Sequence, residues 1–132
     1  MPARILIIED DDFSRDLVQY LLHAAGYVTL DAVDGGVGLQ YALEKNPDLI
    51  LCDLQMPVLN GYDVISRLKN DPHWRPVPVI ALTAFSMASD RDKALAAGFD
   101  DHVTKPIAPE HFIQQIELLL PPTLRALRRL DT

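Results

Sequence analysis

Short runs of apolar residues alternate along the whole chain with longer segments in which apolar residues recur every three or four positions. The short runs are typical of β-strands, and the longer periodic segments are typical of amphipathic helices. Five runs predict strands, and they cover residues 4–9, 27–32, 48–53, 77–83 and 102–104. The pattern therefore predicts a succession of strand–helix units.

A helix is predicted after each strand. These helices cover residues 13–25, 34–46, 61–69, 86–97 and 109–120. Asp34 is a residue type that caps helix starts, and Pro109 stands where proline fits the first turn of a helix. Gly26 and Gly98 supply stops for the first and fourth helices. The predicted elements therefore have recognisable ends.

The predicted third strand carries the continuous apolar run Leu49 to Cys52 without polar alternation. Such a strand is covered on both faces, as central strands of parallel sheets are. Strands that alternate with helices through short connections form a parallel sheet with right-handed crossovers and helices on both faces. The predicted fold class is therefore α/β, with a five-stranded parallel sheet.

The composition fits one small domain. The chain has 132 residues, of which 48% are hydrophobic, and this is enough for one buried core. Its net charge of -7 disfavours direct binding to nucleic acid or to anionic lipid. The single cysteine, Cys52, lies in an apolar run and suits a reducing compartment. Because no signal-peptide pattern or run of about 20 apolar residues is present, we expect a cytoplasmic protein with no membrane segment.

A change in composition at Pro121-Pro122 predicts that the domain covers residues 1–120 and that residues 121–132 form a short tail. The tail carries Leu124, Leu127 and Leu130 among three arginines, so it is either an amphipathic docking segment or a frayed end. We expect the frayed end, because terminal residues are usually poorly held.

Chemically active side chains follow four of the predicted strands. Glu9 to Asp12 follow the first strand, Asp53 ends the third, Thr83 ends the fourth, and Lys105 follows the fifth. The carboxyl ends of parallel strands meet at one edge of the sheet, where ligands gather. Carboxylates brought together there repel one another, and a hard divalent cation such as Mg²⁺ removes that repulsion. Asp10 and Asp53 are therefore candidate Mg²⁺ ligands.

A carboxylate oxygen can also act as a nucleophile and form an aspartyl phosphate. Phosphoryl transfer depends mainly on positioning and on neutralising the phosphoryl oxygens. A cation, the ammonium group of Lys105 and the hydroxyl group of Thr83 together offer such neutralisation beside Asp53.

Four motifs resemble those of the receiver domain of two-component response regulators, and the resemblance covers residues 4–120. They are Ile-Leu-Ile-Ile-Glu-Asp-Asp, Asp-Leu-Gln-Met-Pro-Val-Leu-Asn-Gly, Ala-Leu-Thr-Ala and Thr-Lys-Pro-Ile. Each motif stands at the end of the predicted strand that carries it in receiver domains, and the four motifs follow one another in the same order as in that family. The resemblance implies a flavodoxin-like (βα)5 fold with strand order 2-1-3-4-5.

The resemblance also implies a role for each site residue. Asp53 would accept the phosphoryl group, Thr83 and Lys105 would bind its oxygens, and the Lys105-Pro106 bond would be cis. Mg²⁺ would be held by the acidic pair of Glu9 and Asp10, with Asp10 the direct ligand, by Asp53 and by the backbone carbonyl of Gln55.

This chain departs from the family pattern at His102, and two further positions, Gln55 and Phe85, bear on the lifetime of the phosphoryl group. Receivers commonly place Tyr or Phe three residues before the lysine as a switch that acts with Thr83, whereas this chain has His102. His102 is a hypothetical switch residue. Gln55 and Phe85 stand where the family tunes the access of water to the phosphoryl group, and the large apolar Phe85 predicts slow self-dephosphorylation.

The implied partners are a histidine kinase or a histidine phosphotransfer protein as phosphodonor, and a downstream protein bound through helix four, strand five and helix five. The phosphorylated chain could also signal by forming a homodimer. The resemblance implies no enzymatic activity beyond Mg²⁺-dependent self-phosphorylation and self-dephosphorylation. A receiver module cut from a hybrid histidine kinase or a longer regulator is an alternative origin for the same sequence.

Three other functions fit parts of the pattern. A flavodoxin-like electron carrier shares the strand order, but four acids after the first strand would repel a cofactor phosphate. A haloacid-dehalogenase-like phosphatase needs a second Asp two residues after the nucleophile, where Gln55 stands. A phosphorylation-independent adaptor would not need the complete set of phosphoacceptor residues, which are Glu9, Asp10, Asp53, Thr83 and Lys105.

Overall fold

The computed structural model describes residues 2–84 and 87–126. In these residues five strands alternate with five α-helices, and a short 3-10 helix follows. The strands are β1 (Arg4–Ile8), β2 (Val28–Ala32), β3 (Leu49–Asp53), β4 (Val79–Thr83) and β5 (Asp101–Thr104). The helices are α1 (Asp12–Ala24), α2 (Gly35–Glu44), α3 (Gly61–Lys69), α4 (Ala88–Ala97), α5 (Pro109–Glu117) and the 3-10 helix η1 (Pro122–Leu124).

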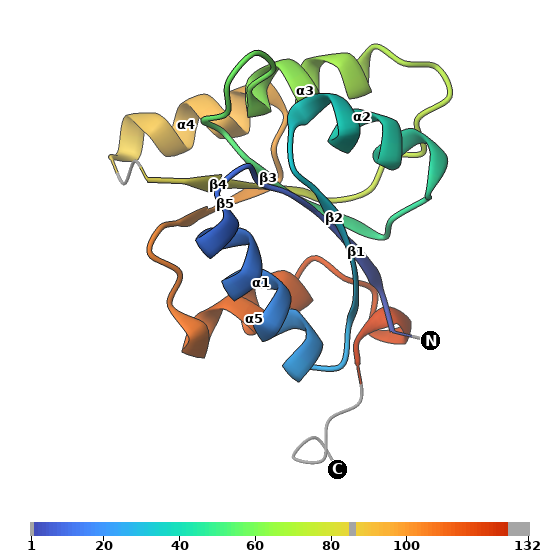
Figure 1. Ribbon diagram of the computed structural model, residues 1–132, viewed down its shortest axis with the longest axis vertical. Helices are drawn as coiled ribbons and strands as arrows, with labels where there is room; N and C mark the ends of the chain where they lie inside the picture. The colour runs from blue at the N-terminus through green and yellow to red at the C-terminus, as the bar shows by residue number, and fades with distance from the viewer. Residues whose placement is uncertain (1, 85–86, 127–132) are drawn as a thin grey trace.

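The five strands form one parallel sheet in the order β2-β1-β3-β4-β5, which confirms the predicted fold class and strand order. Helices α1 and α5 cover one face of the sheet, and α2, α3 and α4 cover the other (Figure 1). None of the helices formed by the described residues is long and apolar enough to cross a bilayer.

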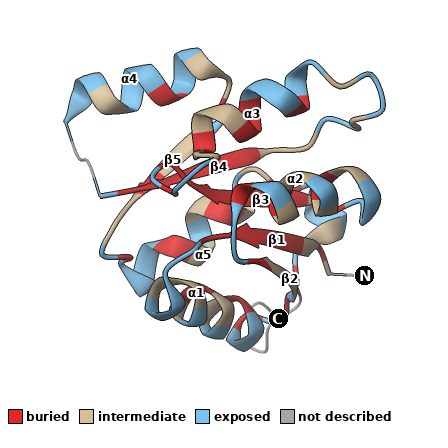
Figure 2. Cartoon of the chain, turned by 45° about the horizontal axis from the view of Figure 1, so that its top comes forward, coloured by how far each residue is buried: buried red, intermediate tan, exposed pale blue. Residues whose placement is uncertain are grey.

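The sheet is the most deeply buried part of the molecule (Figure 2). Every residue of β3 and of β4 is buried, which confirms that the third strand is covered on both faces. Successive side chains of a strand point to opposite faces, so β1 contributes Ile5 and Ile7 to the core beneath α1 and α5, and Leu6 and Ile8 to the core beneath the other helices. Two hydrophobic cores therefore hold the sheet from both sides.

Cys52 is a free thiol in the second of these cores. Burial raises the pKa of the Cys52 thiol, and the nearby charges of Asp53 and Glu9 raise it further. The side chain therefore stays a neutral thiol and serves as a small core residue.

One of the acids that follow β1 caps the start of α1. Asp11 is the capping residue, and its Oδ2 accepts a hydrogen bond of 2.8 Å from the backbone N–H of Ser14. Asp12 is the first helical residue. The predicted cap of α2 is confirmed, because Oδ1 of Asp34 accepts a 2.8 Å hydrogen bond from the N–H of Val37.

The predicted stops after α1 and α4 are confirmed. Gly26 and Gly98 have φ angles of 97° and 114°, in the left-handed region that glycine adopts without a steric penalty. Pro109 is the first residue of α5, as predicted. Strand β4 begins at Val79, two residues later than expected, because Pro78 has no N–H to give to a strand ladder.

The segment after α5 packs against the domain, so a frayed end is the wrong expectation for residues 121–126. The backbone N–H of Ala3 donates to the carbonyl of Leu124 at 2.8 Å, and the N–H of Ala126 donates to the phenol oxygen of Tyr27 at 3.1 Å. Tyr27 in turn donates to the carboxylate of Glu117 on α5. Residues 127–132, which include Leu127 and Leu130, lie outside the described residues.

Gly61 sets how closely α3 approaches the end of β3, and this approach gives the first testable prediction. A Cβ atom at Gly61 would lie 2.6 Å from the backbone oxygen of Asp53 and 2.9 Å from the Cα of Leu54. Gly61→Ala must therefore push α3 away from the strand, and we expect a loss of about 1–3 kcal/mol in the free energy of unfolding.

Urea unfolding of the variant checks this value, with Gly36→Ala as the matched control. Gly36 is an exposed residue of α2, and its added Cβ would meet only a carboxylate oxygen of Asp34 at 3.4 Å. We expect that control to be neutral or slightly stabilised, because alanine favours the helix. Equal stabilities for the two variants would contradict the prediction.

Candidate functional site

The register of the parallel sheet brings the predicted residues to one edge. Ile8 of β1 lies opposite Cys52 of β3, so Glu9 and Asp53, the residues that follow them, lie at adjacent strand ends. On the other side of β3, Asp53 lies opposite Leu82 of β4. Thr83 and Lys105 then follow, one and two strands away from Asp53.

Three carboxylates form a cluster at this edge. Glu9, Asp10 and Asp53 each place a carboxylate oxygen within 4.8 Å of the others, a spacing at which they can share a metal ion. Glu9 is fully buried and Asp53 is 5% exposed, whereas Asp10 is exposed to solvent. The cluster therefore opens to water on the side of Asp10.

The crowding changes the acidity of Glu9. Burial raises the pKa of Glu9 to about 7, and the neighbouring Asp53 adds to the rise, whereas Lys105 opposes it. The three carboxylates carry more negative charge than the single ammonium group of Lys105 can balance. A hard divalent cation, which binds carboxylate oxygens, fits this donor set and supplies the missing charge.

Lys105 is the cation that β5 brings to the cluster. Its Nζ forms an ion pair with Oε1 of Glu9 and lies 3.4 Å from Oδ2 of Asp53. Burial lowers the pKa of Lys105, but the hydrogen bond to Glu9 and the charge of Asp53 raise it above its ordinary value overall. Lys105 is therefore held in its charged form between the two acids.

The carboxylate of Asp53 is held by contacts on both oxygens. Oδ1 accepts a 3.0 Å hydrogen bond from the backbone N–H of Gln55, and Oδ2 faces Lys105. The family resemblance implies that the backbone carbonyl of Gln55 is a metal ligand, and the backbone N–H of the same residue makes the contact seen here. These two contacts fix the rotation of the carboxylate.

Thr83 is buried at the end of β4. Its backbone carbonyl accepts a 2.7 Å hydrogen bond from the N–H of Lys105, which ties the ends of β4 and β5 together. The Lys105-Pro106 bond is cis, as the family resemblance implied. Thr83, Lys105 and Asp53 therefore line one continuous stretch of the edge.

Of His102 and Phe85, only His102 lies within the described residues. His102 lies on β5, and its neighbour Val103 points into the core beneath α1 and α5. Because side chains alternate along a strand, His102 lies on the opposite face, which α4 covers. Phe85 lies outside the described residues, so slow dephosphorylation stays a prediction.

Sequence reasoning missed one residue that contacts the acidic segment. Arg15 of α1 donates from Nη1 to the backbone carbonyl of Glu9 at 2.9 Å and forms an ion pair with Asp12. The residue type and its place one turn into a helix are compatible with many surface roles, so no sequence signal distinguished it.

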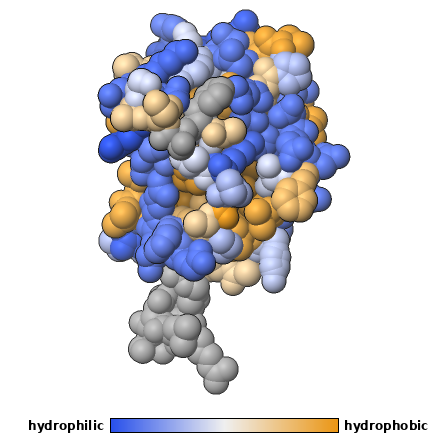
Figure 3. Space-filling view, turned by 90° about the vertical axis from the view of Figure 1, so that its left-hand side faces the viewer, coloured by the Kyte–Doolittle hydropathy of each residue, from blue (hydrophilic) through white to orange (hydrophobic). Residues whose placement is uncertain are grey.

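The surface around the strand ends is mainly hydrophilic, with hydrophobic residues gathered in separate patches (Figure 3). An apolar groove lies beside Lys105 and is formed by Phe13, Ser14, Leu17, Lys105, Pro106 and Ile107. Phe13 is 77% exposed, although it is a large aromatic residue. This groove adjoins the acidic cluster and offers contact area to a molecule that approaches Asp53.

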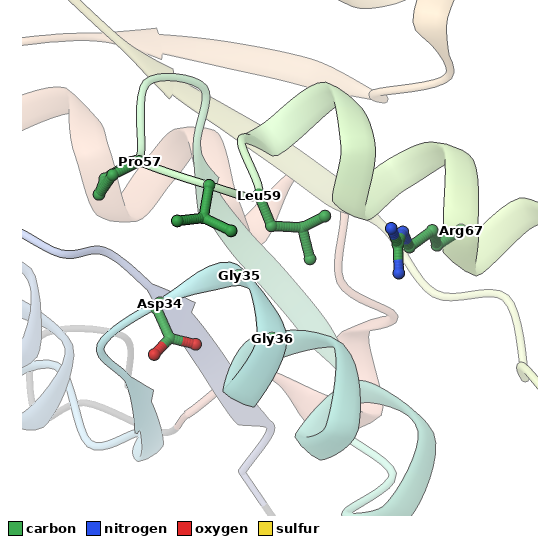
Figure 4. A pocket seen from close by; sticks show the side chains of 7 residues that line it. Asp34, Gly35, Gly36, Pro57, Leu59 and Arg67 are labelled. Carbon is green, nitrogen blue, oxygen red and sulfur yellow. The ribbon is translucent and has the colours of Figure 1, made fainter.

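A second cavity lies between the start of α2, the loop after β3 and α3 (Figure 4). It is lined by Asp34, Gly35, Gly36, Pro57, Val58, Leu59 and Arg67. None of the predicted site residues lines it, so it is separate from the acidic cluster.

Comparisons with known proteins agree with this geometry. The family model for the response regulator receiver domain matches residues 5–117. The polar-differentiation response regulator DivK of Brucella anthropi is 38% identical over 120 residues, which cover 91% of this chain and 98% of that protein.

Two solved structures show the same fold. The chemotaxis protein CheY4 of Vibrio cholerae has a TM-score of 0.83 and 26% identity, with 91% of this chain and 100% of that chain covered. The receiver domain of sensor histidine kinase PA1611 from Pseudomonas aeruginosa was solved with a magnesium ion coordinated in its active site cleft. It has a TM-score of 0.81 and 29% identity, with 90% of this chain and 98% of that chain covered.

The match of the family model over most of the chain, the relatives of nearly equal length and the strand-end motifs all agree. This chain belongs to the response regulator receiver domain family of two-component systems.

Proposed function

We propose that Asp53 of this receiver domain accepts a phosphoryl group from a phosphohistidine of a histidine kinase or phosphotransfer protein. The observation that carries the proposal is the setting of the Asp53 carboxylate. One oxygen is fixed by the N–H of Gln55, and the other lies 3.4 Å from the ammonium group of Lys105. A nucleophile is thereby held in place beside a positive charge.

In the proposed reaction, a carboxylate oxygen of Asp53 attacks the phosphorus atom of the phosphohistidine. The new O–P bond forms as the P–N bond breaks, and the bonding electron pair goes to the imidazole nitrogen. Lys105 and the Thr83 hydroxyl group bind the oxygens of the transferred group and stabilise their charge. The same acyl phosphate forms from a small phosphodonor, and attack of water on it gives self-dephosphorylation.

The proposal assigns Mg²⁺ to the carboxylate cluster. Asp10 and Asp53 bind it directly, Glu9 completes the acidic set, and the Gln55 carbonyl is a further ligand by family analogy. When bound, Mg²⁺ neutralises negative charge on the phosphoryl oxygens. The magnesium ion in the PA1611 receiver supports this assignment.

The proposed partners use different surfaces. The phosphodonor protein approaches the edge of Asp53, where the groove beside Lys105 and the exposed Phe13 offer contact area. The output surface consists of α4, β5 and α5 by family analogy and serves a downstream protein or a second copy of the chain. The proposed compartment is the cytoplasm, which suits the buried free thiol of Cys52.

His102 is the proposed link between the site and the output surface, together with Thr83. Its side chain is 21% exposed, and its Nδ1 atom is buried without a hydrogen-bond partner among the described residues. The nearest acidic oxygen, Oδ1 of Asp101, is 3.9 Å away. An unsatisfied buried nitrogen favours a second rotamer in which it gains a partner.

The Mg²⁺ assignment predicts that Asp10→Asn weakens Mg²⁺ binding at least about tenfold, because one anionic ligand is lost. Isothermal titration calorimetry measures the affinity. Asp92→Asn, an exposed acid of α4, is the matched control for the change in net charge and should bind Mg²⁺ as wild type does. Equal weakening in both variants would show a general charge effect and contradict the assignment.

The phosphoacceptor assignment predicts one added phosphoryl group per chain after incubation with Mg²⁺ and a small phosphodonor such as acetyl phosphate. Intact mass spectrometry should show the added mass in wild type and in the control Asp16→Asn. The added mass should be absent in Asp53→Asn and in wild type incubated with EDTA. The label should be labile to base. Labelling that persists in Asp53→Asn would contradict the assignment, and turnover of a phosphomonoester would favour the phosphatase alternative.

The switch hypothesis predicts that phosphorylation shifts the NMR amide signals of α4, β5 and α5, and that His102→Ala confines the shifts to residues near Asp53. His111→Ala changes an exposed histidine of α5 and is the matched control, which should respond as wild type does. An unchanged response of the output surface in His102→Ala would exclude His102 as the switch.

A further inference from the structure

The acidic segment Glu9–Asp12 joins β1 to α1 and carries Asp10, the most exposed acid of the cluster. Such a segment of consecutive negative charges needs contacts that hold it, since its members repel one another. Arg15 supplies two of them. Nη1 donates to the backbone carbonyl of Glu9 at 2.9 Å, and Nη2 pairs with the carboxylate of Asp12.

The Arg15 side chain is only 14% exposed, which is low for an arginine on a surface helix. It turns back from the first turn of α1 toward the end of β1, where Glu9 follows. The planar guanidinium group presents several N–H donors in a fixed arrangement, so one side chain can hold both ends of the segment. Lysine has a single ammonium group and lacks this geometry.

These contacts bracket Asp10. The carbonyl group of Glu9 belongs to the same planar peptide unit as the backbone nitrogen of Asp10, so Arg15 fixes the chain on the N-terminal side of that residue. On its C-terminal side, Asp11 donates from its N–H to Oε2 of Glu9 at 3.3 Å and caps α1 through Ser14. The backbone direction of Asp10 is therefore set from both sides.

The positive charge of Arg15 and its hydrogen bonds should change the affinity for a cation in opposite directions, so the two effects can be distinguished. A positive charge near a cation site weakens cation binding by Coulomb repulsion, so on charge alone the loss of Arg15 would strengthen it. Asp12 is the main cause that raises the pKa of Arg15, and Asp16 and Asp31 add to it, so the guanidinium charge is constant. If Arg15 favours metal binding, it does so through geometry.

We propose that Arg15 is a positioning residue that orients Asp10 for the divalent cation by bridging the Glu9 carbonyl and the Asp12 carboxylate. The proposal rests on the proposed function, because the cation site is part of it. By this proposal Arg15 increases the affinity for the cation, whereas its positive charge alone would decrease it.

The first experiment is Mg²⁺ titration by calorimetry with the full chain. Arg15→Met should lower the affinity about tenfold, as the loss of supporting contacts around metal ligands does elsewhere. Arg67→Met removes an equal charge from an exposed site on α3 and should leave the affinity within twofold of wild type. Arg15→Lys keeps the positive charge and should restore only part of the lost Mg²⁺ affinity. If Arg15→Met does not fold, Arg15→Lys is compared with wild type in its place.

The second experiment combines Arg15→Met with Asp10→Asn. If Arg15 acts through Asp10, the two losses of affinity are not additive, and Arg15→Met has little further effect in the Asp10→Asn background. Amide hydrogen exchange without Mg²⁺ should also be faster at residues 10–14 in Arg15→Met, while exchange in β3 and β4 stays unchanged. A purely structural role would lower global stability and speed exchange throughout.

An Arg15→Met variant that binds Mg²⁺ as tightly as wild type, or more tightly, overturns the inference and leaves the metal site intact. Additive losses in the double variant overturn it as well. If wild type itself fails to bind Mg²⁺, the metal site of the proposed function falls together with the role of Arg15. The wild-type titration therefore distinguishes the two failures.

Discussion

Negative charge is crowded at one edge of the parallel sheet, and the surrounding elements must hold it there. Glu9, Asp10 and Asp53 come within 4.8 Å of one another because the register places the ends of β1 and β3 side by side. Burial raises the pKa of Glu9, and the neighbouring Asp53 raises it further. Lys105 offsets part of the repulsion from the end of β5, and a divalent cation would offset more.

Such a cluster persists only on a framework that does not yield to the repulsion. The framework here is a sheet packed on both faces, with every residue of β3 and of β4 buried. Gly61 lets α3 approach the end of β3 closely, which fixes the backbone behind Asp53. Phosphoryl transfer depends on positioning more than on covalent catalysis, so this stiffness is part of the chemistry.

In the proposed function, two polar side chains outside the acidic set, Arg15 and His102, connect this framework to signalling. Arg15 ties the acidic segment to α1, and Nδ1 of His102, on the face of the sheet that α4 covers, has no hydrogen-bond partner among the described residues. By the proposal, Arg15 supports the metal site and His102 faces the output surface. The site and its readout are thus supported by different elements, and a change in one can leave the other intact.

Local sequence patterns predicted the order of the elements, the parallel sheet and the polar residues that gather at the carboxyl ends of its strands. The apolar runs that end at Asp53 and Thr83, and the run that ends just before Lys105, are local patterns in the sequence. In a parallel sheet the carboxyl ends of the strands lie at the same edge, so these residues become neighbours. The tertiary structure alone decided that Asp11 caps α1, that Arg15 bridges the acidic segment and that Ala126 packs against Tyr27. These contacts depend on side-chain directions and on the approach of elements far apart in the chain, which hydrophobic periodicity does not encode.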